Sequence, residues 1–158
     1  METKKLITKE GLESLERSLY HAKFVDMPEV IARISEGRSH GDLSENAEYQ
    51  TAKESQTQLN IKIAKLEQMI ANSKVADLSN AASQNTISFG CTVTALNLDT
   101  DNEITVKIVG EYESNFNEGK ISITSPLAKS MLGKKVDDEF TVTTPTSSED
   151  YQITKIAY

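Results

Sequence analysis

The chain has few of the residues that build covalent cross-links or membrane spans. Its 158 residues include one cysteine, Cys91, and no tryptophan. A single cysteine excludes an intramolecular disulfide bond and a zinc site built from cysteines, and we interpret Cys91 as a small buried residue at the start of a strand. No segment approaches the ~20 consecutive apolar residues of a membrane-spanning helix, and the N-terminus lacks the apolar core of a signal peptide. These absences predict a cytoplasmic protein with no membrane partner.

Positive charge is also scarce, and its distribution is uneven. The formal net charge is −7, which argues against a protein that coats nucleic acid through a general basic surface. Residues 1–78 carry 11 Lys and Arg against 13 Asp and Glu, whereas residues 79–158 carry 6 against 11. A nucleic-acid contact is therefore expected to be local, and the first half is the better place for it.

The motifs of the common catalytic classes are absent. The sequence contains no Gly-rich phosphate loop, no strand–turn–helix nucleophile and no nucleophile paired with histidine. His21 and His40 stand alone, without a third ligand at metal spacing, so we interpret both as surface residues. Residue patterns alone therefore support a coiled-coil interaction protein with an appended domain.

The first half has the spacing of two long amphipathic helices. We expect Thr8 to cap the first helix, and a kink or short break near Val25–Met27, before Pro28 opens a second helical piece. Another helix is expected from about Ser44 to Lys74. The apolar seams are Leu12, Leu15, Leu19, Ala22, Val30, Ile31 and Ile34 in the first arm, and Tyr49, Ala52, Gln56, Leu59, Ile63, Leu66, Ile70 and Ser73 in the second.

Each seam is too narrow to form a core alone, so the arms are expected to pair. An antiparallel coiled-coil hairpin with its turn at residues 39–43 satisfies both seams. The sequence thus predicts a first domain over residues 1–78, with an acidic tip at residues 41–45.

The second half changes to the period of β-strands. A linker composition at Asp77–Asn85 precedes it, and a short helix is expected with Ser125 as its N-cap, Pro126 at its first position and Gly133 after its end. The expected strands are Val75–Leu78 at the junction, then Cys91–Leu98, Ile104–Val109, Lys120–Ile123, Glu139–Thr144 and Tyr151–Ile156. The fold class is therefore α+β, with a compact second domain over residues 79–158.

Two carboxylates, Asp42 and Glu45, lie between the two arms. One interpretation is a capping box, in which acidic groups also favour the positive end of the helix dipole. The other is a pair of oxygen ligands for one hard cation such as Mg²⁺. Arg33, Arg38 and Lys53 flank this segment and form either a small patch for phosphate groups or an ordinary solvated helix face.

The segment Gly41–Tyr49, Gly-Asp-Leu-Ser-Glu-Asn-Ala-Glu-Tyr, resembles without a gap the signature of the bacterial GreA/GreB family of transcript cleavage factors. Few cations flank the tip and both acids are present, which favours the GreA type. The resemblance covers nearly the whole chain and implies a helical hairpin followed by a small FKBP-like α+β domain. Further matching segments are Phe89–Thr94, Ile108–Glu111, Glu118–Ser122 and Ser125–Ala128.

The resemblance implies a factor that inserts its hairpin tip into the secondary channel of backtracked bacterial RNA polymerase. Asp42 and Glu45 would be the catalytic carboxylates and would share a Mg²⁺ ion in the polymerase active site, with no metal bound by the free protein. The chain would then stimulate cleavage of the RNA 3′ end by the polymerase and would not be an enzyme itself. Tip support would come from Gly41, Leu43, Ser44, Asn46 and Tyr49.

The same resemblance implies the remaining contacts. Arg38 and Lys53 would steady the extruded RNA, and Ser125 and Pro126 would contact the polymerase at the channel rim. A monomer is expected. Two other functions remain open, namely an FKBP-like prolyl isomerase or chaperone with a coiled-coil handle, and a pure scaffold. The lack of tryptophan argues against the apolar proline pocket of the first.

Overall fold

The computed structural model describes residues 3–39 and 46–158, and the chain divides into two compact units. Unit 2 comprises Leu12–Ser73, and unit 1 combines Met1–Gly11 with Lys74–Tyr158. The sequence places the boundary after residue 78 and assigns the whole N-terminus to the hairpin. In the structure, residues 3–11 instead belong to the same compact unit as residues 74–158.

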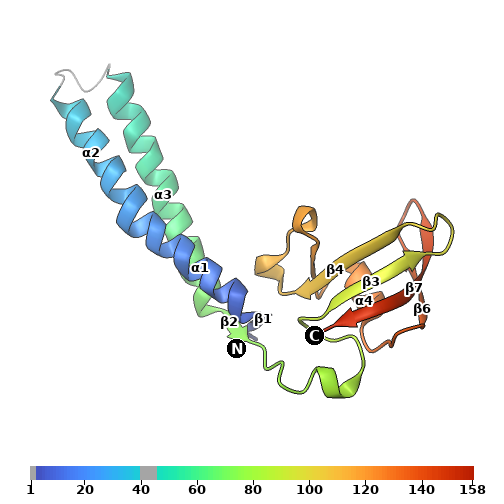
Figure 1. Ribbon diagram of the computed structural model, residues 1–158. Coiled ribbons are helices and arrows are strands. Elements are labelled where there is room, and N and C mark those ends of the chain that lie inside the picture. The colour runs from blue at the N-terminus through green and yellow to red at the C-terminus, as the bar shows by residue number, and fades with distance from the viewer. Residues whose placement is uncertain (1–2, 40–45) are drawn as a thin grey trace. The chain divides into compact units, whose positions relative to one another are not determined.

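Unit 2 is built from helices. Helix α1 (Lys9–His21) continues into a π-helical turn, η1 (Ala22–Asp26), and then into α2 (Met27–Arg38). The π-turn lies where the sequence predicts a break before Pro28, whose missing N–H and bulky ring disfavour a regular α-helical ladder. Helix α3 (Ala47–Ala71) runs beside α2 in the opposite direction (Figure 1). With 25 residues, α3 is about 37 Å long at ~1.5 Å per residue.

The seam between the helices of unit 2 is apolar. Its buried side chains come from both arms, as the heptad spacing predicts, but Ile31 departs from the prediction. Ile31 is 51% exposed, because Val30 and Ile34 already fill the face of α2 that meets α3. The buried cluster comprises Ala22, Val30, Ile34, Ala52 and Leu59, with Met27, Tyr49 and Ile63 packed against it.

The end of α3 differs from the sequence prediction. The helix stops at Ala71, and the chain forms a short strand, β2 (Ser73–Val75), earlier than the strand predicted at Val75–Leu78. Ser73 Oγ donates a hydrogen bond of 2.6 Å to the carbonyl of Met69. One of the last helical carbonyls is thereby satisfied, and Ser73 lies in β2, beyond the C-cap Asn72, instead of extending the seam.

Unit 1 contains a five-stranded sheet in the order β5-β4-β3-β7-β6. Its neighbours pair antiparallel except for β4 and β5, which are parallel. Helix α4 (Pro126–Met131) packs against β5 and β6, and Ala128 and Met131 belong to its buried core. The strands are β3 (Thr92–Asn97), β4 (Glu103–Val109), β5 (Lys120–Ser122), β6 (Glu139–Thr143) and β7 (Ser148–Ala157).

These elements confirm the α+β class, and β7 corrects one boundary. The strand begins at Ser148, not at the predicted Tyr151. Asp150 continues the ladder because it pairs with Thr141, whose hydroxyl donates a hydrogen bond of 2.6 Å to the Asp150 carboxylate. Polar residues that have the composition of a turn therefore extend the strand. In the parts that the structure describes, no helix is long and apolar enough to cross a membrane.

A short strand at the N-terminus, β1 (Lys5–Ile7), explains why the first residues belong to unit 1. It pairs with β2, and its end is held by Glu113. The Glu113 carboxylate accepts hydrogen bonds from Thr8 N (2.7 Å), from the Thr8 hydroxyl and from Gly110 N (3.0 Å). A Cβ atom at Gly110 would lie 2.1 Å from the carbonyl oxygen of Leu6, so β1 and residue 110 touch backbone to backbone.

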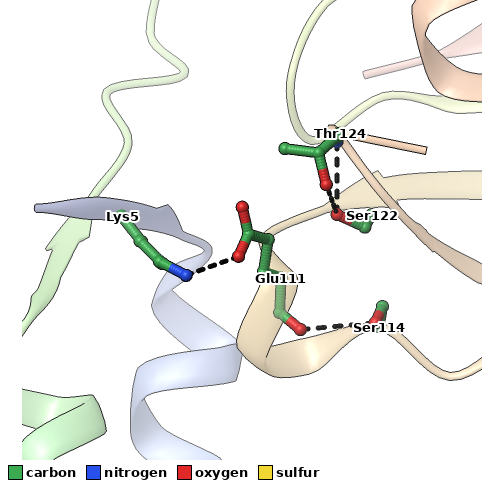
Figure 2. Close-up of polar contacts among 5 residues, drawn as sticks. All are labelled: Lys5, Glu111, Ser114, Ser122 and Thr124. Carbon is green, nitrogen blue, oxygen red and sulfur yellow. Dashed lines mark hydrogen bonds and ion pairs between the residues drawn. The ribbon is translucent and has the colours of Figure 1, made fainter.

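Polar contacts surround this junction. Figure 2 shows Lys5 Nζ at 2.6 Å from Glu111 Oε2, and the hydroxyl of Ser114 donating to the Glu111 carbonyl at 3.3 Å. In the same view, Thr124 N donates to Ser122 Oγ at 3.2 Å. Of these contacts, the one between Lys5 and Glu111 joins β1 to the segment that follows β4, beside the hydrogen bonds of Glu113.

Candidate functional site

The two carboxylates that the sequence singles out lie outside the described residues. Asp42 and Glu45, together with Gly41, Leu43 and Ser44, fall within the segment 40–45. Over residues 3–39 and 46–158, no group of three or more His, Cys, Asp or Glu side chains could hold a metal ion. The described part of the site is therefore the pair of helix ends on either side of this segment.

Asn46 begins α3 and contacts both helices. Its Oδ1 accepts a hydrogen bond from Tyr49 N at 3.0 Å, which is the usual geometry of an N-cap. Its Nδ2 donates to the carbonyl of Gly37, near the end of α2, at 2.6 Å. One half-buried side chain thus joins the two helix ends, and the support of the tip by Asn46 and Tyr49 stays a prediction.

The cations near these ends are exposed. Arg38 is the last residue of α2 and Lys53 lies in the second turn of α3. Arg33 instead faces a hollow of about 410 Å³ between α2 and α3, whose lining also includes Glu36 and Glu48. This face carries more acidic than basic groups. Arg33 is exposed as well, and the assignment of the RNA contact to Arg38 and Lys53 stays a prediction.

Ser125 and Pro126, which the sequence predicts to contact the polymerase, lie at the start of α4. Ser125 caps α4, and its hydroxyl accepts a hydrogen bond from Ala128 N at 3.2 Å. Pro126 occupies the first helical turn and is exposed. Gly133 follows the helix with φ +81°, a left-handed conformation that ends it as predicted.

Two other predicted roles can be compared with the structure. Cys91 is buried just before β3, as expected of a small packing residue. His21 is exposed, and its Nδ1 lies 3.2 Å from Asp26 Oδ2 across the π-turn. His40 lies outside the described residues.

The sequence did not predict the roles of two residues. Gly37 lets α2 and α3 approach closely, and Glu113 holds the N-terminal strand of unit 1. A glycine inside a helical pattern indicates a close approach of another segment, but its partner, Tyr49, lies in the other arm. Nothing near Glu113 in the sequence indicates that its side chain reaches Thr8, because these residues are 105 positions apart.

Comparison with known families places these features in context. Residues 5–75 match the family model of the transcription elongation factor N-terminal domain. Residues 82–158 match the model of the GreA/GreB transcription elongation factor C-terminal domain. The chain therefore belongs to the GreA/GreB family of transcription elongation factors.

Individual relatives agree with this assignment. The chain is 44% identical over 158 residues to the transcription elongation factor GreA of Rickettsia conorii, covering all of this chain and 97% of that protein. It is 44% identical over 152 residues to GreA of Hyphomonas neptunium, covering 96% of each. A solved structure of the transcription factor Gfh1 aligns over 99% of both chains, with a TM-score of 0.47 at 23% identity. The two GreA proteins indicate a GreA-like factor.

Proposed function

We propose that this chain is a transcript cleavage factor that acts inside bacterial RNA polymerase. Its hairpin tip enters the secondary channel of a backtracked complex, where the polymerase cleaves the extruded RNA 3′ end. Family membership over residues 5–75 and 82–158 supports this proposal. The observation that carries it is the sequence of the segment Gly41–Tyr49, in which Asp42 and Glu45 come after α2 and before α3 along the chain.

The chemistry of these residues favours a shared metal site over a complete one. Carboxylate oxygens are the ligands that Mg²⁺ prefers, but this ion takes about six oxygens in octahedral geometry. Asp42 and Glu45 would supply only two of these oxygens, and waters, an RNA phosphate and groups of the polymerase would fill the other positions. A Mg²⁺ ion held there would favour hydroxide formation and in-line attack on the phosphodiester. The chain is accordingly a cofactor of the polymerase and not a nuclease.

The other residues act by binding and orientation. Arg38 and Lys53 are exposed and can contact the phosphates of the extruded RNA by charge alone, without reading its bases. Ser125 and Pro126 open α4 and offer an exposed turn to the polymerase rim. The small number of cations limits how much RNA the factor can hold.

The decisive experiment replaces both tip acids by amides, Asp42→Asn with Glu45→Gln. These variants keep side-chain size and remove negative charge, so polymerase binding should remain while stimulated cleavage is lost. Part of the rate should return at high Mg²⁺, because mass action refills a weakened site. Cleavage is measured on backtracked elongation complexes at matched occupancy, with competition binding in parallel.

The outcomes separate the competing functions. Full cleavage by the double amide would mean that Asp42 and Glu45 only cap a helix, and the proposal would be wrong. A peptide isomerisation assay on the same preparation tests the prolyl isomerase alternative. If the chain is a scaffold, the tip substitutions should change neither RNA cleavage nor peptide isomerisation.

A further inference from the structure

One side chain joins the helix ends that flank the acidic segment. Asn46 accepts from Tyr49 N at 3.0 Å and donates to the Gly37 carbonyl at 2.6 Å. The first bond caps α3. The second ties the start of α3 to the Gly37 carbonyl near the end of α2.

Gly37 lets the two helices approach closely at the same level. A Cβ atom at Gly37 would lie 3.0 Å from Tyr49 Cα and 3.1 Å from Tyr49 Cβ. Gly37 has no left-handed conformation that would require glycine, and glycine within a helix costs about 1 kcal/mol relative to alanine. The glycine therefore serves the contact with Tyr49, and this contact brings the Gly37 carbonyl within reach of Asn46.

Asparagine suits this position because it both donates and accepts. Aspartate and serine cap helices equally well. Aspartate, however, has no donor for the Gly37 carbonyl, and serine is too short to make both bonds. Capping alone therefore does not explain the choice of residue at position 46.

We propose that Asn46 and Gly37 form a clasp that positions the acidic segment for catalysis, with Asn46 as a positioning residue and not a ligand. Asp42 and Glu45 lie between the two clasp residues in the sequence. A misplacement of about 1 Å can lower the rate of a reaction by up to ~100-fold. The rate of cleavage should therefore depend on how these two carboxylates are oriented. This inference rests on the proposed function. It adds that Asn46 and Gly37 orient the residues that carry it.

The test compares Asn46→Ser and Asn46→Asp with the wild-type chain on backtracked complexes. Both variants keep a capping oxygen and lose the donor to Gly37. We expect the maximal cleavage rate at saturating factor to fall about tenfold, within the range that misplacement produces. The factor concentration that gives half the maximal rate should stay within about twofold, because the helices and unit 1 still form. Serine adds no charge, so agreement between the two variants excludes an electrostatic cause.

Gly37→Ala provides a second readout that a merely structural role would not give. The added methyl group favours the helix but presses on Tyr49. We expect its cleavage rate to fall without a matching loss of thermal stability. If the clasp is one unit, Gly37→Ala combined with Asn46→Ser should be no slower than the slower single variant.

The controls distinguish failure of the clasp from failure of the function. If the wild-type chain gives no stimulated cleavage, the proposed function fails and the clasp has nothing to position. If the wild-type chain cleaves and the tip amides do not, yet Asn46→Ser and Asn46→Asp match the wild-type maximal rate, the clasp inference alone is wrong. The clasp inference is also wrong if the cleavage rates of the variants fall only in proportion to their thermal stability. It is wrong as well if the losses of the two single variants add up in the double variant.

Discussion

Replacement of Glu113 by glutamine should loosen the N-terminal strand of unit 1. The carboxylate accepts two backbone N–H groups, from Thr8 and Gly110, and the Thr8 hydroxyl. Glutamine keeps a neutral oxygen for the two backbone N–H groups and places its amide nitrogen beside the Thr8 hydroxyl, so what is lost is the negative charge that strengthens all three hydrogen bonds. Hydrogen bonds to a charged group contribute about 1.5–3 kcal/mol each, against about 0.5–1.5 kcal/mol between neutral groups. Weakening of all three predicts a destabilisation of about 2–4 kcal/mol.

The adjacent Glu111 provides a matched control. Its bond to Lys5 is as short, at 2.6 Å, but the two side chains are 38% and 41% exposed. Solvent screens such a pair, and exposed ion pairs contribute only about 0–1 kcal/mol. Glu111→Gln removes the same charge two residues away (Figure 2) and should cost little.

Hydrogen exchange read by mass spectrometry measures the difference locally. Peptides that cover β1 and the segment after β4 should exchange at least ~30-fold faster in Glu113→Gln, since ~1.4 kcal/mol corresponds to a factor of ten. Peptides from the middle of α3 should be unchanged. Equal exchange in Glu113→Gln and Glu111→Gln would refute the role assigned to the Glu113 carboxylate.

Three further predictions concern the separate units and the product. A fragment of residues 79–158 should melt cooperatively, because it keeps the five-stranded sheet, but at a lower temperature than unit 1 of the full chain, since it lacks Thr8. A disordered fragment would contradict this. Burial, followed by the bond to Glu149, raises the pKa of Tyr151 above 10.0. Because the folded state keeps the hydroxyl neutral, this group stabilises the fold below pH ~10. The free energy of unfolding of the wild-type chain should therefore lose this contribution as the pH rises above ~10, whereas that of Tyr151→Phe should not. Cleavage products should be short, because few cations hold the RNA; predominantly long fragments in a sizing gel would contradict the GreA-type interpretation.

Local signals predicted the helices and most strands well. The three- and four-residue spacing identified the seam of α2 and α3, since a helical face is set by residues a few positions apart. The caps at Thr8 and Ser125 were equally predictable, because a capping oxygen bonds a backbone N–H within three residues. Ile31 shows the limit of such reasoning, because periodicity alone does not tell which edge of an apolar stripe meets the partner helix.

The N-terminal strand could not be predicted for a different reason. Three residues are too few to show an alternating pattern, and β1 exists because β2 and Glu113 hold it. The cost of closing a loop of about 100 residues rises only logarithmically with its length. A few good hydrogen bonds can therefore join distant segments without leaving any local trace in the sequence.

The N-cap residues of α1 and α3 each make two kinds of hydrogen bond. One kind can be predicted from the sequence and the other cannot. Thr8 accepts from Gly11 N at 3.0 Å and also bonds Glu113, while Asn46 accepts from Tyr49 N and also bonds Gly37. In each case the inward bond is an ordinary cap, which residue type and spacing predict. The outward bond depends on which segment the fold brings near, and it requires a group that caps and makes a second hydrogen bond at once. At N-cap residues that also make a second hydrogen bond, we therefore expect substitutions to change function without an equal change in stability.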